Sequence, residues 1–364
     1  MSSTPSQNET ACNLADLVDS LSKDVRYTEP FLLTLDDCTI EIKCSSEAFK
    51  KELTRYFLPL LGTPHGRVKI HIQAIEGPGP SLSCPLTPQK PGPGKTKIKE
   101  EWALLDTGRV VRKVNSGIIM VFGGDQNLVA GPCLSYPNQV INFINNRFIE
   151  YKLNKGGLLG HAAAVFSNGL GIAVAGFSGM GKSTLALHLM NVGADFVSND
   201  RLVMEKTGGH LVMSGVAKWP RINPGTALNN PSLCGVLTAQ EQADFKKLPQ
   251  EALWRLEHKY DVMIDQCYGP ARFRLNAPLD RLVLLNWRLG AGPMKSEEIK
   301  LAHHRPLLQA IMKDTGLFYL PAKGLPQNPS EDQYLDLLAP CRVLALSGGA
   351  DFDQATRTIM DWLS

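Results

Sequence analysis

Eight residues near the middle of the chain have the types and spacing needed to hold a nucleoside triphosphate. Residues 176–183 read Gly-Phe-Ser-Gly-Met-Gly-Lys-Ser, which fits the Walker A pattern G-x-x-x-x-G-K-[ST]. In such a loop glycines let backbone N–H groups turn toward phosphate oxygens, and the helix N-terminus adds partial positive charge. Lys182 would bridge the β- and γ-phosphates, and the Ser183 hydroxyl would ligate Mg²⁺. The predicted nucleotide-binding residues are Gly176, Phe177, Ser178, Gly179, Met180, Gly181, Lys182, Ser183 and Thr184.

The segments on either side of this loop support the same interpretation. Residues 171–175 form an apolar run typical of a buried strand, and residues 184–190 have the composition of a helix. The alternative is a chance glycine-rich turn between a strand and a helix. The need for both neighbours makes that alternative the weaker one.

A histidine is expected at the mouth of this loop. Residues 161–166 form a short apolar strand and residues 167–169 read Ser-Asn-Gly, so the sequence predicts a hairpin with the following strand. With the turn centred near Asn168, the residue opposite His161 lies close to Gly176. The alternative is a histidine that merely ends a strand.

An acid is expected at the same edge of the sheet. Residues 195–200 are predicted to form the next strand, parallel to the strand before the loop and joined to it by a right-handed crossover. Ligands bind beyond the carboxyl ends of such strands, where Asn199 and Asp200 fall. A carboxylate there could ligate Mg²⁺ or act as a base for an attacking hydroxyl. The alternative is that Asp200 pairs with Arg201 or caps a turn.

Two later loops have compositions suited to an anion. Residues 218–226 combine two cations, a tryptophan, two prolines and a glycine, and Arg221 is the candidate cation for a transition state. Residues 268–274 have a similar character. Ordinary turns with solvated charges are the alternative for both.

Length, composition and charge frame the remaining possibilities. The 364 residues suit about two domains, and 43% hydrophobic with 20% charged residues is typical of a globular chain. The net charge is only +3 and the basic residues are scattered along the sequence, which favours neither nucleic acid nor an anionic membrane as a partner. The eight cysteines form no C-x-x-C pair, and the N-terminus is polar without a signal-peptide core. The expected compartment is the cytoplasm.

The pattern of strands and helices divides the chain into two domains. Residues 1–155 are predicted to form a β-rich N-terminal lobe that ends in a long helix over residues 136–152. Within this lobe residues 77–97 contain six prolines and four glycines, so they are expected to be disordered. Residues 156–364 are expected to form the nucleotide-binding domain.

The order of these motifs resembles the bacterial HPr kinase/phosphorylase family. The family pattern runs from a histidine through a short hairpin, G-x-x-G-x-G-K-S and a short helix to two aspartates and an arginine. Here the matching residues are His161, the loop 176–183, and Asn199-Asp200-Arg201. The resemblance is good over residues 158–203 and looser to Trp287. Residues 218–226 and 260–275 are most similar to the HPr-kinase-related "kinase B" branch, which lacks the usual N-terminal domain.

This resemblance implies a fold and an activity. The fold would be α/β, with a P-loop kinase core of the HPr kinase and phosphoenolpyruvate carboxykinase type beside the β-rich α+β lobe. The cofactors would be ATP and Mg²⁺, and the γ-phosphoryl group would pass to a hydroxyl, with a protein serine as the favoured acceptor. The family also suggests homo-oligomers.

The sequence departs from the family at Asn199, which stands where the first aspartate, the usual base, is expected. An amide cannot accept a proton at neutral pH, so either Asp200 or His161 takes that role or transfer proceeds by positioning and charge neutralisation. The departure puts the reverse phosphorolysis in doubt most.

The predicted enzyme is therefore a kinase with Lys182, Asp200, His161 and Arg221 as catalytic residues and with Ser183 and Asp200 on the metal. Two alternatives remain open. One is a kinase of a small polyol or hydroxy-metabolite, and the other is a degenerate module that senses nucleotide and signals by conformation. A GTPase is disfavoured because no Asn-Lys-x-Asp motif occurs. An ABC-type or helicase ATPase is disfavoured because no apolar strand ends in Asp-Glu.

Overall fold

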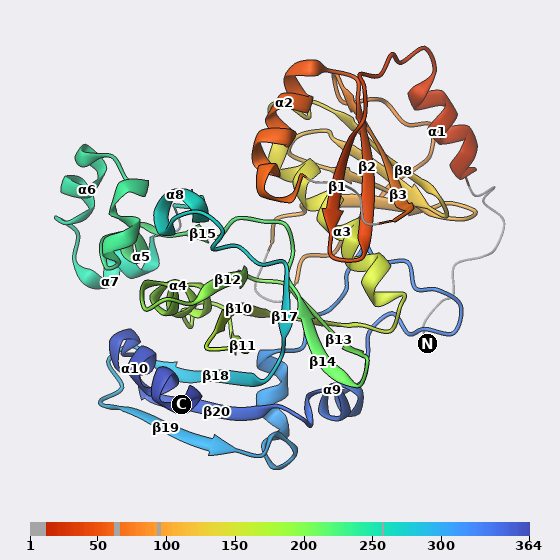
Figure 1. The fold of residues 1–364 in the computed structure, drawn as a ribbon. Coiled ribbons are helices and arrows are strands. Elements are labelled where there is room, and N and C mark those ends of the chain that lie inside the picture. Colours follow the sequence, from red (N-terminus) through yellow and green to blue (C-terminus); the bar gives the residue numbers. More distant parts are fainter. Residues whose placement is uncertain (1–11, 62–65, 93–95, 257) are drawn as a thin grey trace. The chain divides into compact units, whose positions relative to one another are not determined.

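The chain folds into two compact units that both mix helices and β-sheets (Figure 1). The computed structural model describes residues 12–61, 66–92, 96–256 and 258–364. The N-terminal unit is Met1–Phe148 and the C-terminal unit is Ile149–Ser364. The sequence predicts a division after residue 155, whereas the structure divides the chain inside helix α3 (Pro137–Leu153). The last turn of α3 belongs to the C-terminal unit because Ile149 and Leu153 pack with Leu159 there.

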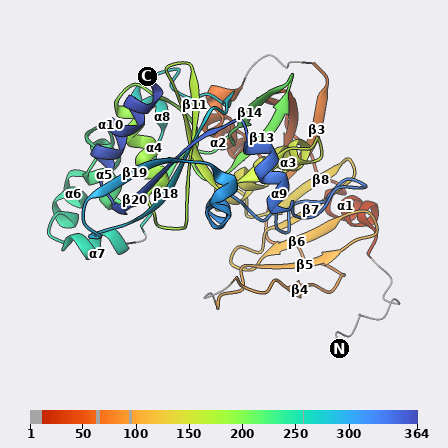
Figure 2. The ribbon, with the colours of Figure 1, turned by 90° about the horizontal axis from the view of Figure 1, so that it is seen from below.

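An eight-stranded sheet forms the N-terminal unit, in the order β1-β2-β3-β8-β7-β6-β5-β4. Neighbouring strands are antiparallel except for β2–β3 and β3–β8, which are parallel. Figure 2 shows β7, β6, β5 and β4 side by side. The strands are β1 (Phe31–Leu35), β2 (Cys38–Cys44), β3 (Val68–Glu76), β4 (Thr87–Pro88), β5 (Glu100–Leu104), β6 (Arg109–Lys113), β7 (Ile119–Gly123) and β8 (Gln126–Gly131).

Helices α1 (Leu14–Ser22), α2 (Glu47–Tyr56) and α3 pack on this sheet. A short 3-10 turn, η1 (Leu58–Leu60), follows α2. The side chain of Ser46 caps α2 by accepting a hydrogen bond from the backbone N–H of Phe49 at 3.3 Å. On α3, Phe143 is fully buried and its ring centroid lies 6.0 Å from that of Phe122 in β7. The long helix predicted over residues 136–152 is confirmed.

The expected disorder of residues 77–97 is wrong for most of that segment. Strand β4 pairs with β5, and the N–H of Gln89 donates to the carbonyl of Glu100 at 2.9 Å. The side chain of Cys84 is only 5% exposed and packs in a cluster with Leu14 and Val18 of α1. The alternating side chains Leu82, Cys84 and Leu86 bury apolar surface, which offsets the entropic cost of ordering a proline-rich segment. Residues 93–95 lie outside the described residues.

A six-stranded sheet is the centre of the C-terminal unit, in the order β12-β10-β11-β18-β20-β19. Strands β11, β18 and β20 are parallel neighbours, and β10 is antiparallel to both β11 and β12. Strand β12 therefore runs in the same direction as β11, as predicted, but β10 lies between them. The strands are β10 (Ala162–Ser167), β11 (Leu170–Gly176), β12 (Asp195–Ser198), β18 (Arg281–Arg288), β19 (Met294–Ile299) and β20 (Arg342–Gly349).

The hairpin predicted before the glycine-rich loop is confirmed. Strands β10 and β11 pair in a register that places Ala162 opposite Ala175. Asn168 and Gly169 form the turn, and both have positive φ, as a two-residue type I′ connection needs. One step beyond the last pair, the register brings His161 opposite Gly176.

A second sheet covers one face of the first because that face is built from alanines. The side chains of Ala162 and Ala164 in β10 and of Ala173 and Ala175 in β11 are all fully buried in one core cluster. Small side chains let the second sheet approach closely. Helices α4 (Lys182–Asn191) and α10 (Phe352–Leu363) pack together in the same unit (Figures 1 and 2). The second sheet has the order β17 (Asn276–Pro278), β14 (His210–Ser214), β13 (Leu202–Thr207) and β9 (Leu158–Gly160).

Short helices complete the C-terminal unit. Helices α5 to α8 follow strand β15 (Arg221–Ile222), which pairs with β16 (Tyr260–Asp261), and they form one helical group beside α4 in Figure 1. The remaining elements are α5 (Pro224–Leu228), η2 (Pro231–Val236), α6 (Ala239–Phe245), α7 (Gln250–Arg255), α8 (Ile264–Tyr268), η3 (Leu301–His303), η4 (Arg305–Ala310) and α9 (Glu331–Leu338).

The close approach of the two sheets predicts a strong effect of Gly171→Ala. A Cβ at Gly171 would overlap the backbone carbonyl of Pro278, and no side-chain rotation can relieve a clash between backbone atoms. We expect a loss of about 3 kcal/mol in the free energy of unfolding, measured by urea denaturation. Gly235→Ala is the control, since no atom of the described residues lies within 4 Å of the added Cβ, and it should change stability by less than about 0.5 kcal/mol. Equal stabilities of the two variants would contradict this account.

Candidate functional site

The glycine loop, residues 176–184, connects the end of β11 to the start of α4. Gly179 and Gly181 have φ values of 82° and 88°, a region that only glycine adopts without strain. Gly181 is the N-cap of α4, and no side chain of the described residues caps this helix end. The first N–H groups of α4 are therefore left for another partner, which is the arrangement that binds an anion at a helix N-terminus.

Neighbouring elements hold the glycine loop in place. The indole N–H of Trp287, from β18, donates to the carbonyl of Met180 at 2.8 Å. The ring of Phe352, the first residue of α10, lies against Gly181, where an added Cβ would come within 2.6 Å of it. An added Cβ on Gly176 would come within 2.9 Å of Leu285. Packing therefore favours glycine at positions 176 and 181, and the backbone conformation favours glycine at positions 179 and 181.

Lys182 lies in the fold of the glycine loop. Its side chain is only 7% exposed, and its Nζ donates to the carbonyls of Gly176 at 2.8 Å and Phe177 at 3.4 Å. Burial lowers the pKa of Lys182 to about 8; the charge of Asp200 opposes this shift and that of Lys313 adds to it. In the described part of the chain only carbonyl dipoles satisfy this cation, so it is available to an anionic ligand.

His161 and Asp200 form a direct pair. The Nε2 atom of His161 lies 3.1 Å from Oδ1 of Asp200, so the histidine is a hydrogen-bond partner of the carboxylate. Burial alone would raise the pKa of Asp200, but the hydrogen bond from His161 and the charges of Lys313 and Arg201 outweigh it, and the pKa lies well below its usual value. Asp200 is therefore an anion at neutral pH, and its side chain is 51% exposed.

Contacts of Ser198 and Gly215 hold the turn that carries Asp200 in place. Ser198 is fully buried and its hydroxyl donates to the carbonyl of Arg201, which closes a tight turn over the two residues between them. Gly215, after β14, packs directly against this turn, because an added Cβ would overlap the carbonyl of Val197. These contacts fix the backbone on either side of Asp200 and so determine where its side chain begins.

Lys313 is a site residue that the sequence analysis missed. Its Nζ lies 3.7 Å from Oδ2 of Asp200. The backbone carries it there, since Met312 bridges to Gly160 and the N–H of His161 donates to the carbonyl of Ile311 at 2.7 Å. No motif surrounds Lys313 in the sequence, so only the tertiary fold could reveal it.

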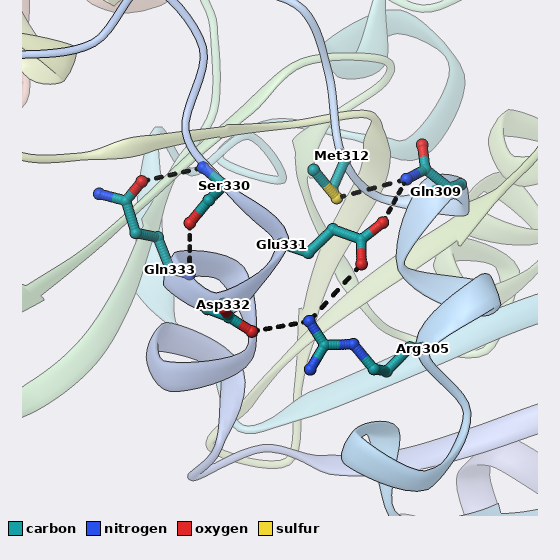
Figure 3. Close-up of polar contacts among 7 residues, drawn as sticks. All are labelled: Arg305, Gln309, Met312, Ser330, Glu331, Asp332 and Gln333. Atoms are coloured by element: carbon teal, nitrogen blue, oxygen red, sulfur yellow. Dashed lines mark hydrogen bonds and ion pairs between the residues drawn. The ribbon is translucent and has the colours of Figure 1, made fainter.

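A polar network holds the segment before Lys313 against helix α9 (Figure 3). Arg305 of η4 forms ion pairs with Glu331 at 3.6 Å and with Asp332 at 2.6 Å, and Gln309 donates to Glu331 at 2.9 Å. Ser330 caps α9 reciprocally with Gln333. These exposed contacts are individually weak, but together they connect both ends of the long loop between Met312 and Ser330.

The two loops predicted to suit an anion differ in the structure. Arg272 and Arg274 both bind Asp195 in β12, with Nε to oxygen distances of 2.9 and 2.8 Å, so their role is structural. Arg221 lies on β15, and its Nε is 3.1 Å from Oδ1 of Asp261. Burial lowers the pKa of Lys218, three residues earlier, and the charge of Arg201 lowers it further while that of Asp200 raises it.

The residues around the glycine loop fit a magnesium ion held together with phosphates. The Oδ1 atom of Asn199 is buried and accepts no hydrogen bond within the described part of the chain, and an amide oxygen is a suitable Mg²⁺ ligand. The Ser183 side chain makes no hydrogen bond with the described residues, whereas Thr184 Oγ1 lies 3.0 Å from Thr226 Oγ1. In the described ranges no three His, Cys, Asp or Glu side chains converge to hold a metal. Magnesium sites commonly need only one or two carboxylates when phosphates supply the other ligands.

Comparisons with known proteins add little to this geometry. No model of a known protein family matches the chain, and no curated protein matches it. One similar solved structure is the Hpr(Ser) kinase/phosphatase from Coxiella burnetii, with a TM-score of 0.29 and 12% identity over 56% of this chain and 89% of that chain. A likeness this weak establishes neither a shared fold nor a shared activity. Among the described residues, no helix has the length and apolar character needed to cross a membrane.

Proposed function

We propose that the chain is an ATP- and Mg²⁺-dependent phosphotransferase that transfers the γ-phosphoryl group to a hydroxyl, with a serine of a protein partner as the first candidate acceptor. The observation that carries this proposal is the His161–Asp200 pair at the end of the strand next to a complete phosphate-binding pattern. A binding module needs only the glycine loop. Phosphoryl transfer also needs a group that positions the acceptor hydroxyl. Asp200, paired with His161, is such a group, and its charge acts on Lys182.

Each residue has a role that follows from its position. The N–H groups of the glycine loop and Lys182 bind the phosphates, and Ser183 and Asp200 would hold Mg²⁺, which neutralises charge on the transferred group. Asp200 also accepts a hydrogen bond from the acceptor hydroxyl, and His161 orients the Asp200 carboxylate. Arg221 remains a candidate for charge stabilisation, held by Asp261.

The chemistry places modest demands on a base. The acceptor oxygen forms a bond to the γ-phosphorus while the bond to the β,γ-bridging oxygen breaks, ADP leaves with the electron pair, and the hydroxyl proton passes to the carboxylate or to water. Because the transition state of phosphoryl transfer is loose, positioning and electrostatics supply most of the rate. A carboxylate with a low pKa, such as Asp200, is adequate for that purpose.

The direct test is transfer from [γ-³²P]ATP in the presence of Mg²⁺ and cell lysate. A labelled protein band identifies a protein acceptor, and label in the small-molecule fraction identifies a hydroxy-metabolite. ATP binding without label in either fraction would favour the degenerate nucleotide sensor, for which Asn199 is the motivating observation. Absence of ATP binding would overturn the proposal.

The low pKa of Lys182 predicts that ATP binding takes up protons. At pH 8 about half of the lysine is neutral in the empty site, and phosphate charge should restore the proton, so affinity is full below pH 7 and falls as pH rises through 8. Calorimetry at pH 8 in two buffers of different ionisation enthalpy should show an uptake of about 0.5 proton per site. Lys182→Arg, which stays charged, should show none. Identical uptake by both proteins would assign the proton elsewhere.

Asn199→Asp is expected to raise transfer about tenfold. In the present chain Asp200 alone would serve both the metal and the hydroxyl, and a second carboxylate would divide these tasks. Asn223→Asp is the matched control because its Oδ1 is also buried without a partner among the described residues, on a different loop. An unchanged rate for Asn199→Asp, measured as labelled acceptor per minute, would show that proton removal does not limit transfer.

A further inference from the structure

Two side chains approach the Asp200 carboxylate, one at each oxygen. The Nε2 atom of His161 lies 3.1 Å from Oδ1, and the Nζ atom of Lys313 lies 3.7 Å from Oδ2. The backbone that carries Lys313 is anchored two residues earlier, where the carbonyl of Ile311 accepts a hydrogen bond from the N–H of His161 at 2.7 Å. The fold therefore brings the lysine and the histidine to the carboxylate together.

The contact between Lys313 and Asp200 is loose. A separation of 3.7 Å exceeds the length of a normal hydrogen bond, so the two side chains form an ion pair. The buried lysine pair of the same unit has a different geometry, because Nζ of Lys152 lies 2.6 Å from Oε1 of Glu205 and the two side chains are 3% and 13% exposed. Lys313 and Asp200 are 26% and 51% exposed. A long, partly exposed ion pair contributes little to stability, so folding alone does not explain the position of Lys313.

Lys313 also acts on the glycine loop through its charge. After burial, the causes that shift the pKa of Lys182 are the charge of Asp200, which raises it, and that of Lys313, which lowers it. The two lysines come from segments far apart in the chain and lie within electrostatic reach of each other. Their mutual repulsion is unfavourable in the empty site. An anion that contacts both ammonium groups would turn this repulsion into a binding contribution.

The position beside Asp200 identifies which phosphate Lys313 would contact. In the proposed function the acceptor hydroxyl meets the γ-phosphoryl group at Asp200, whereas the glycine loop holds the phosphates nearer to the nucleoside. A lysine at Asp200 is therefore placed for the γ-phosphoryl group. In phosphoryl transfer charge is spread over the three equatorial oxygens of this group, and a cation that contacts them stabilises the transition state.

We propose that Lys313 is a further catalytic residue, whose ammonium turns from Asp200 to the γ-phosphoryl group when ATP binds. This inference rests on the proposed phosphotransferase function and adds a residue to its site. Lys313 forms no covalent bond in the reaction and neutralises charge on the transferred group. A long ion pair suits this exchange, because little is lost when it is broken.

The test compares nucleotides with and without the γ-phosphate. The β,γ-imido analogue of ATP and ADP are titrated by calorimetry in the presence of Mg²⁺. Lys313→Met should lower the affinity for the analogue at least about tenfold and that for ADP less than about twofold, because one charged contact to the γ-phosphate is lost. Lys313→Arg keeps the charge and should retain most of the preference for the analogue. Lys206→Met, at an exposed position on β13, is the control and should change neither affinity.

A second background separates a direct contact from one that acts through the carboxylate. If Lys313 contacts phosphate, Lys313→Met should also lower the analogue affinity at least about tenfold in a protein that carries Asp200→Asn. No further loss in that background would make Lys313 a support for Asp200 and would overturn the inference. Equal losses for ADP and the analogue would also overturn it, because the lysine would then contact a phosphate that both nucleotides share.

The transfer assay gives an independent readout, and the two proposals fail separately. In that assay Lys313→Met should lower kcat by about 10²-fold or more. The nucleotide preference is measured without turnover, so its loss in Lys313→Met supports the contact even where the lysate assay labels no acceptor. Wild-type protein that binds neither nucleotide would remove the phosphotransferase function and this role with it. An active wild-type protein and a Lys313→Met variant with unchanged preference would remove only the role of the lysine.

Discussion

Lys182→Met is expected to abolish tight ATP binding while the C-terminal unit stays folded. The lysine is buried, and among the described residues its ammonium has only the carbonyls of Gly176 and Phe177 as hydrogen-bond partners, at 2.8 and 3.4 Å. Two carbonyl dipoles compensate the ammonium charge poorly, so most of the favourable interaction of this charge is left for a bound triphosphate. A hydrogen bond to a charged group contributes about 1.5–3 kcal/mol, and contacts to two phosphates would together lower the affinity by more than about 100-fold when lost.

Methionine is the informative replacement because it keeps the length of the buried stem. Two hydrogen bonds to the loop are lost, but the cost of burying an ammonium is lost with them, so the melting temperature should fall by only a few degrees. Calorimetric titration with Mg²⁺ and ATP measures the affinity, and Lys206→Met on the exposed face of β13 is the control. A folded Lys182→Met variant with undiminished affinity would show that the loop does not bind phosphate.

The parts of this site that sequence could predict are those fixed by local patterns. The turn residues Asn168 and Gly169 and the alternation of β10 and β11 determine the register that brings His161 to Gly176. The glycine pattern determines where β11 ends and α4 begins. These are contacts between residues close in sequence, and such contacts follow from propensity and spacing.

The parts that sequence could not predict depend on distant segments. Lys313 lies more than a hundred residues after Asp200 in the sequence. The backbone bridge between Met312 and Gly160 brings it to Asp200, and no periodic pattern in the sequence predicts that bridge. The same reason explains the wrong expectation for residues 77–97. Proline and glycine content predicts a lack of helix, but it does not show that Cys84 has a partner surface on α1.

Arg272 and Arg274 illustrate a different limit. Their loop has the composition of an anion site, and the anion is Asp195 of the same chain. Composition identifies a charge that needs a partner, whereas only the fold says whether the partner is internal.

The second large effect is expected at the His161–Asp200 pair, where the two side chains should act as one unit. Nε2 of His161 lies 3.1 Å from Oδ1 of Asp200, and only the nitrogen can carry the proton because the carboxylate stays ionised. His161 therefore donates to Asp200, and its influence on the acceptor passes through the carboxylate. A residue that acts only through another adds nothing once that other residue is gone.

We expect Asp200→Asn to lower kcat for phosphoryl transfer by about 10³-fold and to raise the Mg²⁺ requirement, because it removes both the proposed metal ligand and the proposed partner of the hydroxyl. His161→Ala should lower kcat by about 10²-fold and leave the binding of Mg²⁺ and ATP unchanged. The double variant should be no slower than Asp200→Asn alone. His210→Ala, an exposed histidine on β14, is the control and should retain full activity.

The double variant decides between two roles for the histidine. If the losses multiply, His161 contacts the acceptor independently, and its Nε2 must leave Asp200 when substrate binds. If His161→Ala keeps full transfer, the pair is structural and His161 only ends a strand. Loss in the double variant equal to that of Asp200→Asn leaves the histidine as a positioning residue. Its single variant should then regain much of the rate as His161→Gln, whose amide N–H₂ can still donate to the carboxylate.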